Sequence, residues 1–404
     1  MKKRILFIGI NMNCGGTEKS FLSLANCLDY DRYDVDLLLA RRDGLFAELI
    51  PPRINVRVMP KYGEFFFLSN KNAFSNILNT FAKGNPLTAF EVMPYFLKMA
   101  IFPSKKREAA IRLWCRLLRK FPDFEGEYDA AVAYWGDRTI FYMIDKVPGA
   151  KRKIAWMHFD YNTPPRDDLT YRRYFSECDA IVNVSEAVNS ALIGKLPEFA
   201  PKCAVIENIL SPSLIRRMAL EGPSFPDAGF KGKRVLSVIR IAKQKGYDFI
   251  PPILAGLRER GRDVRWYILG EGDEANKAEL AALALKYGVA DSLILLGTTT
   301  NPYPYMRDCD VYVQPSRFEG KPITVEEAKI MRCPIVAANY TSASEQLKGG
   351  EYGLIADAKP EALLEAVDRL LSAPKLRERL SQTLAACDFG SEGEIEKFYR
   401  LIEG

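Results

Sequence analysis

The most informative segment of the chain reads PSRFEGKPITVEEA, from Pro315 to Ala328. It follows a short apolar run, 311–314, that predicts a buried strand, and it ends in a helical pattern that begins near Thr324. The loop between them carries a carboxylate at Glu319, and the free amides of the helix start face the end of the strand. A pyrophosphate suits such a helix start, and a carboxylate can accept hydrogen bonds from two vicinal hydroxyls of a ribose or sugar.

The helix start also has a purely structural explanation. Thr324 and Glu327 fit a capping box, in which the glutamate satisfies the amide of the N-cap residue. That interpretation explains Glu327 but leaves Glu319 without a role. The residues alone leave both interpretations open.

Strand and helix patterns alternate on both sides of this segment. Buried strands are expected at 4–10, 35–39, 130–134, 153–157 and 180–184, and again at 234–238, 264–269, 293–296, 311–314 and 335–338. Helices are expected at 17–28, 274–287, 323–331 and 360–382. Alternation of this kind is typical of parallel sheets covered on both faces, so the sequence predicts an α/β protein with two doubly wound, Rossmann-like domains.

The domain boundary is expected in the strand-poor, Pro- and Gly-rich stretch 210–232. This divides the chain into an N-terminal domain, 1–210, and a C-terminal domain, 211–389. A last helix near 392–403, within 390–404, is expected to cross back onto the N-terminal domain. Each doubly wound sheet offers a ligand crevice at the carboxyl ends of its strands.

Composition excludes several classes of protein. The net charge of the 404 residues is only +6, without long Lys/Arg runs, so no nucleic-acid partner is expected. Eight cysteines without a CxxC pair and a single histidine predict neither a disulfide framework nor a zinc site. No apolar run reaches the roughly 18 to 20 residues that a spanning helix needs, so a cytoplasmic protein is expected.

Three Asp-x-Asp triplets could in principle hold a divalent cation. They lie at 29–31, 34–36 and 308–310, next to predicted strand starts and turns rather than strand ends. We interpret all three as structural and expect no metal site.

The segment 98–120 carries eight basic residues and one acidic residue. On a helical wheel Arg112, Arg116 and Arg119 share one face and Trp114 lies on another, which predicts an amphipathic basic helix. Such a helix is either packed on the core with a solvated basic face, or peripheral on an anionic membrane surface. The sequence favours neither.

Two motifs follow predicted strands of the N-terminal half. Gly15 and Gly16 open a helix, where glycines let the backbone approach an anion, although a tight turn with Thr17 as N-cap explains them equally well. His158 follows the strand at 153–157. A lone histidine is more often structural, but strand ends are where α/β proteins place binding groups.

Two cations follow the first strand of the C-terminal half. Arg240 and Lys245 are five residues apart, and fixed cations at a strand end suit a diphosphate both when it is bound and when it leaves. Two solvated loop cations are the structural alternative.

Together these residues resemble a known family. The segments 296–306, 309–316, 319–322 and 327–328 resemble the retaining GT-B glycosyltransferases of family 4, and Glu319 with Glu327 matches that family's E-x7-E motif. Further matches, in the same order along the chain, are Gly15–Gly16, His158, Ser185–Glu186, Asn208, Arg240–Lys245–Gly246, Gly270–Glu271–Gly272 and Glu345 with Gly353. The resemblance implies two domains that face a cleft, the N-terminal one on the acceptor side and the C-terminal one binding the donor.

The resemblance also implies roles. Glu327 would hold the nucleotide ribose, Thr298 would lie near the base, and Arg240 and Lys245 would stabilise the departing diphosphate. The remaining residues would surround the donor sugar: Gly15, Gly16, His158, Glu319, Gly320, Lys321, Pro322 and Ile323. The implied reaction moves a sugar from a nucleotide-sugar, by resemblance a UDP-sugar, to a glycan or lipid-linked acceptor of surface polysaccharide synthesis, with retention and without a metal or cofactor.

Two residues depart from the family pattern. Ile239 stands before Arg240, where the family usually has a glycine. Arg332 stands where a glycine normally ends the helix in a left-handed conformation, so this helix is expected to end differently.

Other functions on this fold stay open. The alternatives are an epimerase or inverting transferase on the same fold, or a nucleotide-sugar-binding scaffold without turnover. Retention of Arg240, Lys245, Glu319 and Glu327 argues against the scaffold.

Overall fold

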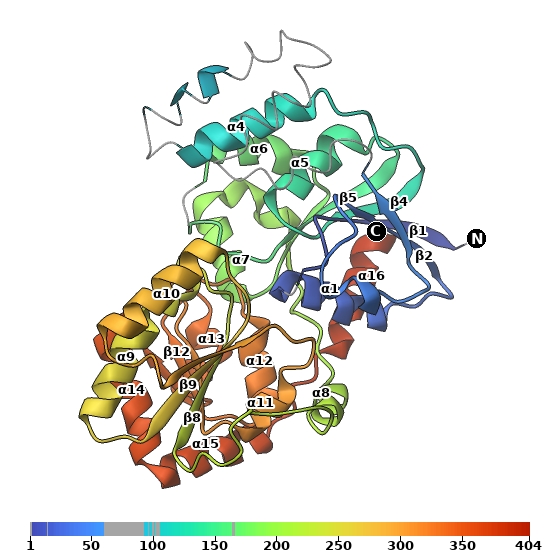
Figure 1. The fold of residues 1–404 in the computed structure, drawn as a ribbon. Helices are drawn as coiled ribbons and strands as arrows, with labels where there is room; N and C mark the ends of the chain where they lie inside the picture. Colours follow the sequence, from blue (N-terminus) through green and yellow to red (C-terminus); the bar gives the residue numbers. More distant parts are fainter. Residues whose placement is uncertain are drawn as a thin grey trace.

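The computed structural model describes residues 2–13, 15–59, 93–95, 97, 98, 101, 106–163 and 166–404. Two parallel sheets flanked by helices lie one above the other (Figure 1). Their strand orders are β3-β2-β1-β4-β5-β6-β7 and β10-β9-β8-β11-β12-β13. In both, the order reverses beside the first strand, which is the doubly wound arrangement. The predicted α/β class with two Rossmann-like domains is confirmed.

The first sheet and its helices come almost entirely from the N-terminal half. The strands are β1 (Lys3–Gly9), β2 (Tyr33–Leu39), β3 (Asn55–Val58), β4 (Tyr128–Ala133), β5 (Ala150–Met157), β6 (Ala180–Asn183) and β7 (Cys203–Val205). The helices are α1 (Gly16–Cys27), α4 (Lys106–Leu118), α5 (Asp137–Lys146), α6 (Asp168–Ser176), α7 (Glu186–Lys195) and α16 (Ile395–Glu403).

The second sheet is formed by residues 233–356. Its strands are β8 (Lys233–Val238), β9 (Val264–Leu269), β10 (Leu293–Gly297), β11 (Val311–Gln314), β12 (Ile335–Ala338) and β13 (Leu354–Ala356). The helices around it are α8 (Pro212–Met218), α9 (Ile250–Glu259), α10 (Glu274–Lys286), α11 (Tyr303–Asp308), α12 (Ile323–Ile330), α13 (Ala343–Gln346), α14 (Pro360–Ser372) and α15 (Pro374–Ala385).

The strands are apolar on both faces because helices cover both. In β1, Leu6 and Ile8 pack with α4 to α7, whereas Ile5 and Phe7 pack with α1 and α16 on the opposite face. All four side chains are fully buried. This two-sided burial explains why the central strands are continuous apolar runs in the sequence.

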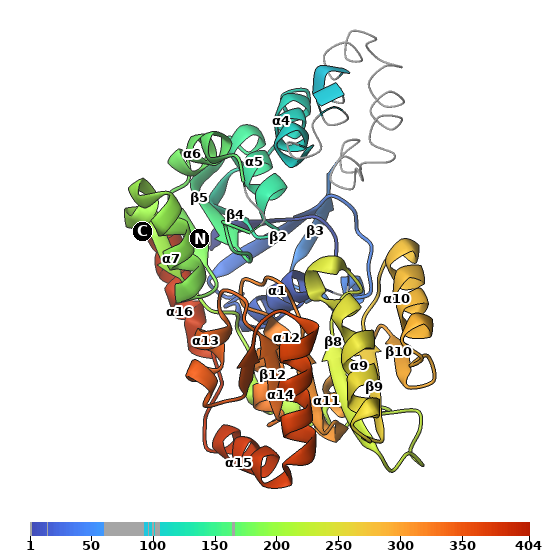
Figure 2. The same cartoon turned by 90° about the vertical axis from the view of Figure 1, so that its left-hand side faces the viewer.

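The C-terminal helix α16 lies on the first sheet although it follows the second in sequence (Figures 1 and 2). The Phe398 ring lies 5.7 Å from that of Phe7 and 5.6 Å from that of Trp156. Ile395 and Ile402 are buried in the same apolar cluster. The amphipathic pattern of α16 is therefore satisfied by the N-terminal core.

Two expectations about helix ends are wrong. The single helix expected at 360–382 is two helices, because Pro374 cannot continue α14 and instead occupies the first turn of α15. The end of α12 was expected to differ from the glycine pattern, yet Arg332 itself is left-handed, with φ 60°. The amide of Cys333 donates to Ala328, which gives the Schellman ending at a cost on the order of 1 kcal/mol for a residue other than glycine.

The strands missing from the sequence-based prediction are β3, β7 and β13. All three are short, and most of their residues are only half-buried because they lie at or next to sheet edges. They therefore lack the apolar runs that mark the central strands.

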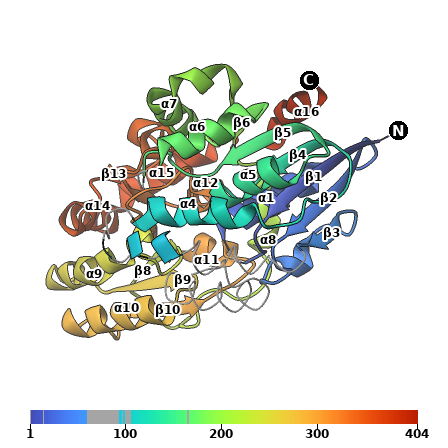
Figure 3. The same ribbon diagram turned by 90° about the horizontal axis from the view of Figure 1, so that it is seen from above.

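The basic segment forms α4 in part, and residues 99, 100 and 102–105 lie outside the described residues. Trp114 is buried, whereas Arg112, Arg116 and Arg119 are exposed, so the predicted amphipathic helix is confirmed. Arg112 donates to Asp167 at 3.1 Å and pairs with Glu108. In the view from above, α4 lies in front of the first domain (Figure 3). Among the described helices, none combines the length and apolarity needed to cross a bilayer.

Candidate active site

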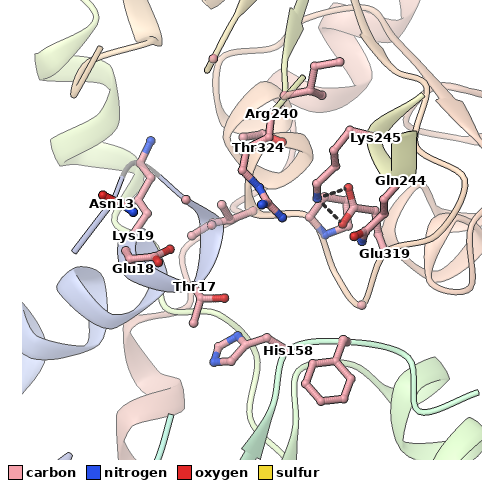
Figure 4. Close-up of a pocket in the computed structure, with 18 of the residues that line it drawn as sticks. Asn13, Thr17, Glu18, Lys19, His158, Arg240, Gln244, Lys245, Glu319 and Thr324 are labelled. Carbon is pink, nitrogen blue, oxygen red and sulfur yellow. Dashed lines mark hydrogen bonds and ion pairs between the residues drawn. The ribbon is translucent and has the colours of Figure 1, made fainter. Parts of the chain in front are cut away.

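The carboxyl ends of both sheets face one cavity of about 780 Å³ between the domains. Its lining includes every predicted site residue except Glu327: Gly15, Gly16, His158, Arg240, Lys245, Thr298, Glu319, Gly320, Lys321, Pro322 and Ile323. They follow β1, β5, β8, β10 and β11 along the chain, and Figure 4 labels four of them: His158, Arg240, Lys245 and Glu319. The fold thus brings together residues that are up to 308 positions apart, from Gly15 to Ile323.

Lys245 and Glu319 form an ion pair at the C-terminal side of this cavity (Figure 4). The Lys245 Nζ lies 2.7 and 2.8 Å from the two carboxylate oxygens of Glu319. The hydroxyl of Ser316 also donates to this carboxylate, at 2.7 Å, and the amide of Gln314 at 3.2 Å. Glu319 is 7% exposed, so its charge is held in place by three donors.

The turn that carries Lys245 depends on Gly246. Gly246 has φ 73°, and a Cβ on it would come within 2.1 Å of the carbonyl oxygen of Pro315. Only glycine allows both the left-handed turn and this close approach. The turn therefore holds Lys245 directly beside the loop of Glu319.

Arg240 is the exposed cation of the site. Within the described part of the chain it has no ion-pair partner, in contrast to Lys245. Across the cavity is Glu18, whose carboxylate accepts from the indole of Trp135 at 3.3 Å. Burial raises the pKa of Glu18, and the Trp135 hydrogen bond and the charge of Arg240 oppose this in part. Arg240 is thus available to a ligand anion.

The two domains come into close contact at Gly320. A Cβ on this glycine would lie 2.3 Å from the carbonyl oxygen of His158. On the other side of the cavity, Gly16 lies beside Ile323, so the starts of α1 and α12 face each other. Glycines at these two places let the backbone amides approach a ligand between the domains.

His158 presents a neutral imidazole to the cavity. Its ring lies 4.6 Å from that of Tyr134, and its Nε2 is buried without a hydrogen-bond partner among the described residues. Burial lowers the pKa of His158 to about 3. The side chain is therefore uncharged near neutral pH and can donate to or accept from a sugar hydroxyl.

Glu327 does not form the capping box with Thr324 that the structural interpretation of this helix start predicted. Thr324 lies inside α12 rather than at its N-cap, which is Pro322. Glu327 is fully buried, and its Oε1 accepts from the Tyr303 hydroxyl at 2.9 Å and from Lys19 Nζ at 2.5 Å. The capping-box interpretation is wrong.

The side chain of Lys321 has its own partner. Its Nζ lies 2.7 Å from Glu207, and its carbonyl oxygen accepts from the Asn208 amide at 3.2 Å. Lys321 lines the main cavity and also a smaller one of about 160 Å³. Because its ammonium is committed to Glu207, its contribution to the cavity comes from the backbone.

The Asp-x-Asp carboxylates have structural partners. Asp29 accepts from the amide of Asp31 at 2.9 Å, Asp36 accepts from the Tyr128 hydroxyl at 2.6 Å, and Asp310 pairs with Lys233 at 2.8 Å. No group of His, Cys, Asp and Glu suited to a metal occurs among the described residues.

Several residues of the cavity escaped the sequence analysis. They are Lys19, Trp135, Arg138, Gln244 and Pro302. Lys19 carried a usable signal, because a cation in the first turn of a helix opposes the helix dipole. Arg138 lies in the first turn of α5, and Trp135, Gln244 and Pro302 lie in turns next to helix starts; none of the four belongs to a motif.

The pKa of His158 predicts how stability depends on pH. An unfolded histidine has a pKa of about 6.5, whereas His158 in the native state has a pKa of about 3. Between these two pH values the unfolded chain binds a proton that the native state does not bind. The contribution of His158 to the free energy of unfolding is therefore fully present above about pH 6.5 and is lost as the pH falls below it. The loss is about 1.4 kcal/mol between pH 7.5 and 5.5. Urea unfolding at both pH values measures this loss. His158→Gln should remove it, and an equal pH dependence in that variant would contradict the assignment.

Comparison with known proteins agrees with this geometry. Residues 226–385 match the family model of the glycosyl transferases group 1. The chain is 26% identical to an uncharacterized glycosyltransferase of Haemophilus influenzae, over an alignment of 409 positions that covers 100% of both chains. It is 29% identical over 206 residues to an N-acetylgalactosaminyltransferase of Campylobacter jejuni that acts on a diphospho-undecaprenol-linked sugar, covering 50% of this chain and 54% of that protein.

The fold is also that of solved glycosyltransferase structures. The Anabaena protein HepE, solved with UDP and glucose, superposes with a TM-score of 0.69 at 16% identity and 99% coverage of both chains. At this identity the likeness shows the fold alone. Taken with the family model and the two facing sheets, it leads to one conclusion: the chain is a glycosyltransferase of the GT-B fold, and its residues 226–385 form the glycosyl transferases group 1 domain.

Proposed function

We propose that the protein transfers a sugar from a UDP-sugar to a saccharide or lipid-linked glycan of surface polysaccharide synthesis, with retention and without a metal. The observation that carries this proposal is the convergence of Arg240, Lys245 and the α12 start on one interdomain cavity. HepE, with the same fold, binds UDP, and the relative from Campylobacter jejuni acts on a lipid-linked acceptor. These likenesses support the choice of donor and acceptor.

The charges around the cavity suit departure of a diphosphate. Arg240 and Lys245 offer two cations, and the free amides of α12 add partial positive charge at the same cavity. A phosphate at Lys245 would compete with Glu319 for the ammonium. Glu319 would then be free to accept hydrogen bonds from the hydroxyls of the donor sugar.

Retention follows from a front-face displacement. The acceptor hydroxyl attacks the anomeric carbon on the face from which the diphosphate leaves, and the leaving phosphate oxygen takes the hydroxyl proton. Neutral His158 and the backbone of Gly320 would line the sugar from opposite domains. This route needs no protein nucleophile.

Inverting transfer is the second candidate because Glu18 places a carboxylate on the acceptor side of the cavity. Its position favours a structural role, since a Cβ on Gly15 would come within 2.3 Å of its Oε2 and Trp135 donates to its Oε1. The anomeric configuration of the product relative to the donor distinguishes the two reactions.

The nucleotide is tested by thermal unfolding with UDP, GDP and ADP. A ligand that binds only the native state stabilises it by about 2.7 kcal/mol at a hundredfold excess over its Kd. We expect UDP to raise the Tm by several degrees and Lys245→Ala to weaken this shift. Lys243→Ala is the matched control, because Lys243 lies two residues away and pairs with Glu279 outside the cavity. Absence of a shift with every nucleotide would contradict the proposed function.

Metal independence is tested on the transfer reaction itself. Because protein cations would neutralise the diphosphate, EDTA should leave the rate of sugar transfer unchanged within about twofold. A rate that falls in EDTA and returns with Mg²⁺ or Mn²⁺ would contradict the metal-free mechanism.

A cytoplasmic protein that meets a lipid-linked acceptor is expected at the inner membrane face. The exposed basic face formed by Arg112 and Arg116 of α4 and by Arg119, directly after α4, would contact anionic lipid there. Replacing all three by glutamine should release the protein from vesicles that contain phosphatidylserine. The matched control replaces Lys286, Lys375 and Arg379, three exposed cations on α10 and α15, and should not alter binding. Equal partitioning of both variants would make α4 a structural helix.

A further inference from the structure

Lys19 reaches from the N-terminal domain to a carboxylate of the C-terminal domain. Its Nζ lies 2.5 Å from Glu327 Oε1 and 4.5 Å from the centre of the Tyr303 ring. The side chain is only 17% exposed, and that of Glu327 is fully buried. An interdomain ion pair this deeply buried forms part of the wall between the domains.

Lys19 lies in an unfavourable place for its own helix. It is in the first turn of α1, where the helix dipole repels a cation. Burial alone would lower the pKa of Lys19, but the charge and hydrogen bonds of Glu327 and Tyr303 outweigh this and raise it. The ammonium therefore stays charged because of Glu327, and α1 gains nothing from it.

Glu327 has only one of its two oxygens in use. Oε1 accepts from both Tyr303 and Lys19, whereas Oε2 is buried without a partner among the described residues. A buried carboxylate oxygen without a donor is costly and uncommon in a native protein. A ligand with two adjacent hydroxyls would satisfy both oxygens at once.

Lys19 lies between Glu327 and the cavity. Lys19 lines the cavity, as do Ile323 and Thr324 at the start of α12, but Glu327 one turn further along does not. Pro302, next to Tyr303, also lines it. A ligand in the cavity could reach Glu327 only after the Lys19 side chain had moved.

We propose that Lys19 occupies the nucleotide-ribose position in the donor-free protein, so that the donor binds by exchanging its ribose hydroxyls for the Lys19 ammonium on Glu327. The inference rests on the proposed function, because it takes the ligand to be a nucleotide. It accounts both for the interdomain ion pair of Glu327 and for its buried Oε2, which has no partner among the described residues. It also makes Lys19 a competitor that lowers the apparent affinity for every nucleoside.

The competition is tested with Lys19→Gln, which keeps one neutral hydrogen bond to Glu327 and removes the charge. Isothermal titration with UDP and with uridine should give Kd values lower by about fivefold or more, and by the same factor for both ligands, because the competition concerns the ribose. Lys19→Arg, which keeps the cation, should leave both Kd values close to those of the wild type. Lys329→Gln is the matched control: Lys329 is a buried lysine paired with Glu326 on the same helix, and it does not line the main cavity.

Two results with Lys19→Gln would overturn the inference. Unchanged Kd values would show that Lys19 does not compete, and weaker binding of UDP with unchanged binding of uridine would make Lys19 a phosphate ligand. Both leave the proposed function intact if Lys245→Ala still weakens UDP binding. Failure of the wild type to bind any nucleotide would overturn the proposed function and the inference with it.

A measurement on the wild type guards against a variant that does not fold. Acetylation of Lys19 by acetic anhydride, followed by mass spectrometry, reports whether its amine is accessible. Uridine should accelerate acetylation of Lys19, because exchange releases the amine into the cavity, and should leave Lys329 unchanged. Unchanged or slower acetylation of Lys19 in uridine would overturn the exchange.

Discussion

The structure of the site is governed by the need to neutralise two buried carboxylates, one on the loop before α12 and one in α12 itself. Glu319 and Glu327 are 7% and 0% exposed, and each has a lysine within hydrogen-bond distance. Unpaired charges at these positions would cost several kcal/mol each. Lys245 comes from the same domain and Lys19 from the opposite one, so the second pair also joins the domains. A phosphate that takes the place of Glu319 on Lys245, or a diol that takes the place of Lys19 on Glu327, acts on a site that is already charge-balanced.

The sequence located the central strands and most of the site residues, because apolar runs mark buried strands and binding groups follow strand ends. Continuous apolar runs located the central strands because both faces of each sheet are covered, and the strand ends located Arg240, His158 and Glu319. The Lys19–Glu327 pair could not be found, because nothing in the sequence links residues 308 positions apart. At Arg332 a local sequence rule gave the wrong prediction. The left-handed position at the end of α12 favours glycine, but the Schellman hydrogen bonds and the packing around it hold an arginine in that conformation.

Contacts across the cleft are mostly polar and exchangeable. The Glu345 carboxylate accepts from the backbone amides of Glu186 and Ala187, at 3.3 and 2.8 Å, at the exposed start of α7. The hydroxyl of Thr341 donates to Asp160 at 2.6 Å. Water can replace each of these hydrogen-bond partners when the domains separate. Interfaces of this kind permit opening and closing around a ligand.

The direction of such a motion is limited by two chain crossings rather than one. The segment after β7 enters the C-terminal domain, and the segment before α16 returns from it. The two are tied together, because Ser391 Oγ accepts from the amide of Leu210 and donates to the carbonyl of Asn208, both at 2.8 Å. A double crossing resists twisting and sliding but allows rotation about the line through it. Asn208 also donates to the carbonyl of Lys321, so rotation about this hinge would move the Glu319–Gly320 loop relative to His158 on the facing domain.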